Sequence, residues 1–186
     1  MSWWCLRVQT TTPGRQQVNE DEVLDVVDER DEVVGQARRA DVYARNLRHR
    51  CAFVLARAAD GRIFVHRRTA QKLVFPSLHD MFVGGVLGTG ESYDEAAKRE
   101  AEEELGVSGL SPRFLFKFLY RDGEQSWWSA VYEVETPLAV APQESEVAWH
   151  AFLTEEELAA RLAEWEWVPD GLAAWRELRA RQDAPR

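Results

Sequence analysis

The spacing of apolar residues along the chain changes from short runs typical of strands to the repeat of an amphipathic helix and back. Apolar runs at residues 23–27 and 33–36 flank a charged turn, which predicts a β-hairpin. The runs at residues 51–57 and 62–66 are joined by Asp60-Gly61, a dipeptide that strongly favours a second hairpin. Further strands are predicted near residues 81–87, 113–120, 127–134 and 147–152.

Helical segments are interleaved with these strands. Helices are predicted at residues 39–47, at 92–105, from Thr154 onward and at 170–181. The segment 92–105 has the clearest boundaries, because Ser92 and Glu95 form a capping box and Gly106 stands where a left-handed stop is expected. The order of elements predicts one α+β domain over residues 21–186, with a mixed sheet flanked by helices.

The remaining residues and the composition narrow the class of protein. Residues 1–20 show no sustained periodicity and are predicted to be a disordered tail. The 186-residue chain is 45% hydrophobic and 30% charged, which suits one globular domain with a sizeable core. Its net charge of -9 argues against a nucleic-acid polymer or an anionic membrane as partner.

Location in the cell follows from what the sequence does not contain. It has neither a signal peptide nor a run of about 18 apolar residues. Its two cysteines, Cys5 and Cys51, do not suggest a disulfide framework. We therefore expect a cytoplasmic protein without a membrane span.

The predicted helix 92–105 concentrates carboxylates on one face. At about 100° per residue, Glu103 and Glu104 fall on either side of Glu100, whereas Glu102 points roughly the opposite way. Like charges at this spacing repel, so the cluster is unfavourable without a compensating cation. Hard oxygen ligands suit Mg²⁺ or Mn²⁺. A solvated, glutamate-rich helix face is the simpler alternative.

The longer segment around this helix carries a recognisable motif. It resembles the Nudix box, G-x5-E-x7-R-E-U-x-E-E-x-G-U, in which U is an aliphatic residue. The strict positions are occupied by Gly85, Glu91, Arg99, Glu100, Glu103, Glu104 and Gly106. Ala101 at the first U position is a mild departure that affects packing more than chemistry. Seven strict letters in register favour the metal site over the solvated face.

This resemblance implies a fold, a reaction and a set of site residues. The fold would be the Nudix α/β/α sandwich, and the reaction a metal-dependent hydrolysis of a diphosphate bond in a nucleoside diphosphate linked to another moiety. The resemblance assigns metal binding to Glu100, Glu103, Glu104 and the carbonyl at Gly85. It assigns catalysis to Glu103, Glu100, Arg99 and Glu91, with one glutamate as the base, and Glu91 and Arg99 tying the loop to the helix.

Residues upstream of the box resemble one branch of the family. Arg67-Arg68, Lys72 and Pro76 match an R-R-x3-K-x3-P stretch found in type I isopentenyl diphosphate isomerase and in similar bacterial hydrolases. The isomerase needs a C-G-H triplet before an altered box, whereas this chain has Gly84-Gly85-Val86 and an intact box. Isomerase activity is therefore disfavoured. A non-catalytic, nucleotide-binding Nudix module is a second alternative, although such modules commonly lose box acids.

Several residues outside the box are candidates for binding a small-molecule diphosphate. Arg67, Arg68 and Lys72 can meet phosphates, although alternation along a strand predicts that Arg67 and Arg68 do not both do so. Trp127 either lies in the core or stacks on a base. Glu146 either supplies an extra carboxylate to the site or lies on a solvated loop. A homodimer is expected by analogy with the family.

Overall fold

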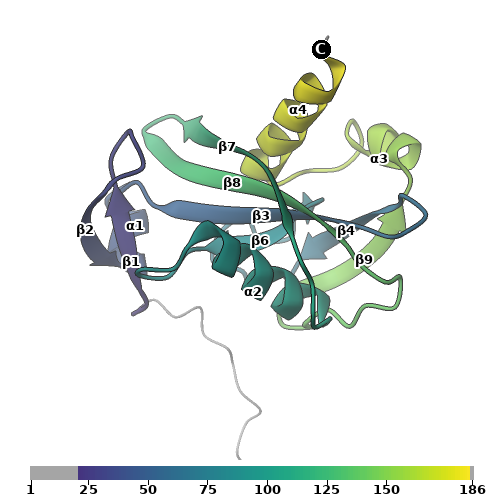
Figure 1. Cartoon of the computed structure of the whole chain (residues 1–186), viewed down its shortest axis with the longest axis horizontal. Coiled ribbons are helices and arrows are strands. Elements are labelled where there is room, and N and C mark those ends of the chain that lie inside the picture. Colours follow the sequence, from purple (N-terminus) through teal and green to yellow (C-terminus); the bar gives the residue numbers. More distant parts are fainter. Residues whose placement is uncertain (1–20, 185–186) are drawn as a thin grey trace, which may run out of the picture.

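The structure is a computed structural model that describes residues 21–184 (Figure 1). The tail predicted for residues 1–20 lies outside the described residues. The strands are β1 (Val23–Val27), β2 (Val33–Arg38), β3 (Arg50–Arg57), β4 (Ile63–Arg68), β5 (His79–Asp80), β6 (Val83–Val86), β7 (Arg113–Asp122), β8 (Gln125–Glu135) and β9 (Val147–Leu153). The helices are α1 (Arg39–Ala44), α2 (Tyr93–Leu105), α3 (Glu155–Arg161) and α4 (Pro169–Asp183).

The strands form two sheets. Strands β1 and β2 make an antiparallel pair, and the larger sheet has the order β5-β4-β3-β8-β7, with β6 on β3 and β9 on β4. Strand β3 is parallel to β8 and antiparallel to β4 and β6, so the sheet is mixed. Strands β3 and β4 pair only at Arg57 and Ile63, and beyond that point β3 pairs with β6 instead. The two strands of the hairpin therefore part as they leave the turn.

Strand β3 separates two apolar layers. Its residues Phe53 and Leu55 pack in the cluster that contains Trp175 of α4, whereas Ala52 and Val54 pack in the cluster formed with the apolar face of α2. This division follows from the alternation of side chains along a strand. Figure 1 shows α2 and α4 on opposite sides of the sheet. The predicted α/β/α sandwich with a mixed sheet is confirmed.

Most predicted elements agree with the structure to within a few residues, and two differ. The strand predicted near 81–87 is β6 and begins at Val83, because the carboxylate of Asp80 accepts a hydrogen bond from the Phe82 amide and turns the chain between the short strand β5 and β6. Helix α1 ends at Ala44 rather than at residue 47, because Asn46 adopts a left-handed conformation with φ of 51°.

The ends of α2 are as the sequence predicts. Ser92 accepts from the Glu95 amide, and the Glu95 carboxylate accepts from Ser92 in return, which completes the capping box. Gly106 has φ of 64°, and a Cβ there would lie 2.1 Å from the Ala141 carbonyl oxygen. The helix therefore stops at a residue that only glycine can fill.

Candidate active site

A cleft of about 1000 Å³ lies along the diverging strands β3 and β4. One wall is the polar face of α2 together with β6, and another is formed by α1 and the loop that follows β4. The first turn of α4 contributes Asp170 to the lining. The cleft thus joins segments from across the whole chain.

The box acids of α2 line this cleft. Glu104 is buried, Glu100 is mostly buried, and the side chain of Glu103 is 52% exposed. The Gly84 amide donates to Glu104 Oε2 at 3.4 Å. A Cβ on Gly85 would lie 2.6 Å from Glu100 Oε1, so the absence of a side chain lets β6 approach the helix. The helix brings the three acids to one face, as their spacing predicts.

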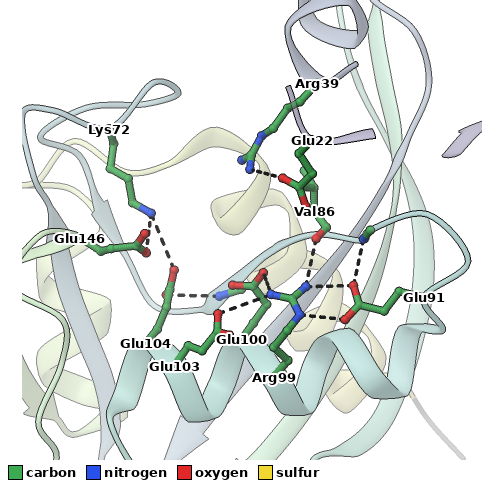
Figure 2. Close-up of polar contacts among 12 residues, drawn as sticks. Glu22, Arg39, Lys72, Val86, Glu91, Arg99, Glu100, Glu103, Glu104 and Glu146 are labelled. Carbon is green, nitrogen blue, oxygen red and sulfur yellow. Dashed lines mark hydrogen bonds and ion pairs between the residues drawn. The ribbon is translucent and has the colours of Figure 1, made fainter. Parts of the chain in front are cut away.

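Arg99 is the centre of an ion-pair network on α2 (Figure 2). Its guanidinium donates to both carboxylate oxygens of Glu91, at 2.8 and 2.9 Å, and to Glu100 Oε1 at 2.7 Å. Glu91 also accepts from the Gly88 amide at 2.9 Å. Burial acts to raise the pKa of Glu91, but the hydrogen bonds from Arg99 and from the Gly88 amide, together with the charge of Arg99, outweigh it and lower that pKa. Glu91 and Arg99 therefore connect the loop before α2 to the helix.

Lys72 supplies the second cation of the site. Its ammonium lies 2.6 Å from Glu146 Oε2 and 3.9 Å from Glu104 Oε1 (Figure 2). Burial raises the pKa of Glu104 well above its usual value, and Lys72 only partly opposes this. For Glu146 burial acts in the same direction, but the charge of Lys72 and the hydrogen bonds with Lys72 and Glu104 together outweigh it, and the pKa is lowered. Two carboxylates from distant parts of the chain thus share one ammonium.

The donor set is suited to a hard divalent cation. Arg99 and Lys72 are the basic side chains that pair with the acids here, and the acids that share them are Glu91, Glu100, Glu103, Glu104 and Glu146. Within residues 21–184, no three acidic, histidine or cysteine side chains already converge as a ligand set. The acids instead turn toward the two basic side chains. The excess of carboxylates over cations is the charge that a divalent ion would neutralise.

The other predicted binding residues divide between the cleft and the outside. Arg68, Lys72, Trp127 and Glu146 line the cleft. Arg67 is exposed and is not among the residues that line the cleft, because side chains alternate along β4. Trp127 is 8% exposed and belongs to the core cluster while also lining the cleft.

Glu102 lies on the opposite face of α2, as its spacing predicts. It lies away from the cleft, but it is half-buried and accepts hydrogen bonds from the Gly109 and Leu110 amides at 2.8 and 3.1 Å. These bonds fasten the turn after α2. Glu102 is therefore a structural acid rather than a solvated one.

Four charged residues that line the cleft were not predicted from the sequence: Glu22, Arg39, Asp80 and Asp170. Arg39, from α1, donates to Glu22 Oε2 at 3.1 Å (Figure 2) and to the Tyr43 hydroxyl at 3.2 Å. None of the four belongs to a motif, and they reach the cleft from separate parts of the chain. Nothing in the sequence pattern marks them.

Comparisons with known proteins identify the family to which similar chains belong. Residues 47–175 match the family model of the NUDIX domain. The chain is 70% identical over 162 residues to an uncharacterized Nudix hydrolase, SCO1686, of Streptomyces coelicolor, which covers 86% of this chain and 90% of the relative. It is 37% identical over 166 residues to the uncharacterized Nudix hydrolase YfcD of Escherichia coli, covering 88% of this chain and 91% of that relative.

Solved structures show the same architecture. The crystal structure of DR0079 from Deinococcus radiodurans superposes with a TM-score of 0.73 at 36% identity, covering 84% of this chain and 98% of that one. The NUDIX domain of Shewanella oneidensis NrtR, solved with ADP ribose, has a TM-score of 0.54 at 16% identity and shares the fold, over 73% of this chain and 88% of that one.

The described part of the chain contains no helix with both the length and the apolarity to cross a membrane. The box residues in register, the α/β/α sandwich, the family model and the relatives agree with one another. Proteins of this kind generally use divalent metal ions. The chain belongs to the Nudix family.

Proposed function

We propose that the chain hydrolyses a diphosphate bond in a nucleoside diphosphate linked to another moiety, with Mg²⁺ or Mn²⁺ as cofactor. The observation that carries this proposal is the excess of carboxylates on the cleft face of α2, which share Arg99 and Lys72. The NrtR domain, which has the same fold, was solved with ADP ribose, a compound of the proposed type. A cytoplasmic location and a homodimer stay predictions from the sequence.

The metal would be held by the carboxylates of Glu100, Glu103 and Glu104 and by the Gly85 carbonyl. When bound, it supplies positive charge for the diphosphate and lowers the pKa of a water molecule. Arg99 positions Glu100 through the 2.7 Å hydrogen bond, and Glu91 fixes Arg99 in turn. Glu104 is buried, so bulk water does not reach that end of the site.

A base must accept the proton of the water that attacks phosphorus. Glu103 is the box acid that solvent reaches most easily, since its side chain is 52% exposed while those of Glu100 and Glu104 are 14% and 5% exposed. We assign this role to Glu103. The proton passes to its carboxylate as the water oxygen bonds to phosphorus, and the phosphate on the other side of the broken bond leaves with the bridging oxygen.

Basic side chains on the walls facing α2 complete the site. Arg39, Arg68 and Lys72 all line the cleft, and each is tied to an acceptor of the protein: Glu22, the Val74 carbonyl and Glu146 respectively. A diphosphate entering the cleft offers these cations new acceptors. They would orient the substrate and stabilise the charge of the leaving phosphate.

The proposal is tested by comparing Glu103→Gln with Glu102→Gln. Both changes are isosteric and lie on adjacent residues of α2, but only Glu103 lines the cleft. Product release is measured over nucleotide sugars and dinucleotides with Mg²⁺ and Mn²⁺. We expect Glu103→Gln to lower kcat by about 10²- to 10⁴-fold and Glu102→Gln to leave kcat unchanged. Equal activity of Glu103→Gln and wild type would refute the assignment.

The same screen separates the alternatives. A protein that binds nucleotides and hydrolyses none with either metal would be a binding module. Turnover of isopentenyl diphosphate to its isomer would indicate an isomerase. That reaction is disfavoured by Gly84 and Val86 at the cysteine and histidine positions of its C-G-H triplet, and by the burial of Cys51, which raises the thiol pKa well above its usual value.

A further inference from the structure

The loop that precedes α2 is held from outside the cleft by the β1–β2 hairpin. Asp25 of β1 is only 8% exposed, and its Oδ2 accepts a hydrogen bond from the Gly90 amide at 2.9 Å. In the same loop, the Thr89 hydroxyl donates to the Val23 carbonyl at 2.8 Å. The contact between Asp25 and Gly90 joins residues 65 positions apart, so it belongs to the tertiary structure.

Asp25 is an uncommon residue for its place. Strands are depleted in Asp, and a buried carboxylate is unfavourable unless it accepts hydrogen bonds. Its second oxygen, Oδ1, accepts from Gln36 Nε2 across the hairpin at 3.1 Å. Arg50, whose charge acts on Asp25, forms its ion pair with Asp31 at 2.6 Å instead. Two neutral donors therefore satisfy the two oxygens of Asp25, and one of them is the backbone of the loop.

A chain of contacts leads from Gly90 to the cleft face of α2. Glu91 follows Gly90, and its two carboxylate oxygens accept from Arg99 at 2.8 and 2.9 Å (Figure 2). Arg99 in turn donates to Glu100 Oε1 at 2.7 Å. Asp25 is not among the residues that line the cleft, so it acts on Glu100 only through this chain.

The bonds within the loop fix its shape but not its place. The Gly88 amide donates to Glu91 Oε2 at 2.9 Å, and the Glu91 amide donates to the Gly88 carbonyl at 3.1 Å. Gly90 has φ of 73°, a conformation that glycine adopts without strain. The bonds to β1 are the ones that set the position of this turn relative to the sheet.

The hairpin is firmly anchored before it meets the loop. Asp31, in its turn, accepts from Arg50 of β3 at 2.6 Å and from Lys117 of β7 at 2.5 Å. Leu24, next to Asp25, is fully buried in the core cluster that also contains residues of α4. A side chain on such a support can hold a neighbouring site in one geometry.

We propose that Asp25 is a positioning residue for the cation site on α2. Its Oδ2 fixes the loop at Gly90, and Glu91 and Arg99 transmit that position to the Glu100 carboxylate. The assignment rests on the proposed function, since it takes Glu100 as a ligand of the divalent ion. Removing a partner that orients a metal ligand typically lowers metal affinity by about 10- to 100-fold. Asp25 acts through two further side chains, so we expect the lower end of this range.

The test is the affinity of the full chain for Mn²⁺, measured by calorimetry without substrate at a temperature where every variant is folded. Asp25→Ala removes the acceptor of the Gly90 amide and should weaken Mn²⁺ binding about tenfold. If Asp25→Ala does not fold, Asp25→Val also lacks an acceptor, suits a strand better and carries the same expectation. Equal Mn²⁺ affinities of the folded variant and wild type would overturn the proposal.

Two matched variants separate positioning from a general effect on the hairpin or on charge. Gln36→Ala removes the other hydrogen bond of the same carboxylate and should bind Mn²⁺ as wild type does. Asp25→Asn keeps an oxygen that can accept from Gly90 but carries no charge, so it should also retain the affinity. A loss in Gln36→Ala as large as in Asp25→Ala would assign the effect to the hairpin as a whole. A tenfold loss in Asp25→Asn would assign it to charge, and either result would contradict the proposal.

The outcome is separable from that of the hydrolysis screen. Hydrolysis by wild type with equal Mn²⁺ affinities of wild type and Asp25→Ala would remove the positioning role and keep the reaction. The expected loss of Mn²⁺ affinity, without hydrolysis of any diphosphate by wild type, would keep the positioning role and remove the reaction. Absence of Mn²⁺ binding to wild type would remove both.

Discussion

The two walls of the cleft hold acids under opposite conditions. On α2 the carboxylates meet Arg99 and Lys72 at ion-pair distances. On the α4 wall, Asp80 and Asp170 are held by backbone amides and repel each other. The first wall therefore keeps an excess of negative charge that suits a metal ion, whereas the second tends toward a shared proton. The same residue type serves different chemistry according to its neighbours.

The helices that carry these walls also begin in different ways. Helix α2 starts at a capping box made by Ser92 and Glu95, three residues apart. Helix α4 has no side-chain cap, begins at Pro169, and rests its first turn against Asp80 of a distant strand. The start of α2 is thus local in sequence, whereas the start of α4 depends on a tertiary contact.

Removal of divalent metal should have the largest effect and should affect only the α2 wall. Dialysis against EDTA is expected to reduce hydrolysis to the uncatalysed background, and Mg²⁺ or Mn²⁺ should restore it, because no cation of the protein replaces the metal's charge. Product release that continues in EDTA would show that the acids of the α2 wall do not need a metal ion for hydrolysis.

Substitution of Arg99 by Met should have an intermediate effect. It leaves Glu91 and Glu100, whose side chains are 18% and 14% exposed, without the guanidinium. We expect a loss of about 1–3 kcal/mol in the free energy of unfolding, with a melting temperature lower by roughly 2–4 °C for each kcal/mol. Activity should fall at least about tenfold, because Glu100 loses its positioning contact.

Lys98→Met is the matched control for Arg99→Met. Lys98 is the preceding residue on α2, is exposed and does not line the main cleft. The variant removes the same charge, so it should melt close to wild type and retain activity. Identical melting curves for Arg99→Met and Lys98→Met would show that the ion-pair network does not stabilise the α2 wall.

Substitution of Asp80 by Asn should have the smallest effect and should appear as a change in pH dependence. Burial raises the folded-state pKa of Asp80 to about 7 from its usual value of 3.8. The folded protein therefore holds a proton that the unfolded chain releases at lower pH, and this contribution to stability is lost as pH rises from about 4 to 7. Asn does not titrate, so the variant avoids this loss.

The measurement is the melting temperature of both proteins from pH 4 to pH 8 in EDTA. The difference, Asp80→Asn minus wild type, should grow in favour of the variant as pH rises through this window and then level off above pH 7. Glu177→Gln, on the exposed face of α4, should show no such trend. If the difference in melting temperature between Asp80→Asn and wild type did not change with pH, ionisation of Asp80 would not destabilise the folded protein.

The sequence predicted features that depend on neighbours along the chain. The capping box at Ser92, the stop at Gly106 and the hairpin at Asp60-Gly61 each involve residues a few positions apart, and each is present in the structure. The gathering of Glu100, Glu103 and Glu104 follows from helical geometry in the same way. Local spacing is sufficient because one regular element sets the relative positions of all its side chains.

Long-range contacts were beyond the reach of that argument. Glu146 meets Lys72 across 74 residues, and Asp80 meets Gly171 in the first turn of α4 across 91. Arg67 and Arg68 are adjacent, yet only Arg68 faces the cleft. No sequence spacing encodes these relations, since each depends on how β4 and β5 are placed beside other elements.

The sequence by itself determined the family, the sandwich of strands and helices, and the helix on which the acids are arranged, because these follow from periodicity and a contiguous motif. The tertiary structure alone decided that the box acids share Arg99 and Lys72 and that Asp80 and Asp170 form a second acidic pair in the same cleft. The physical reason is that charge state and burial depend on the groups that packing brings together, which local spacing does not specify.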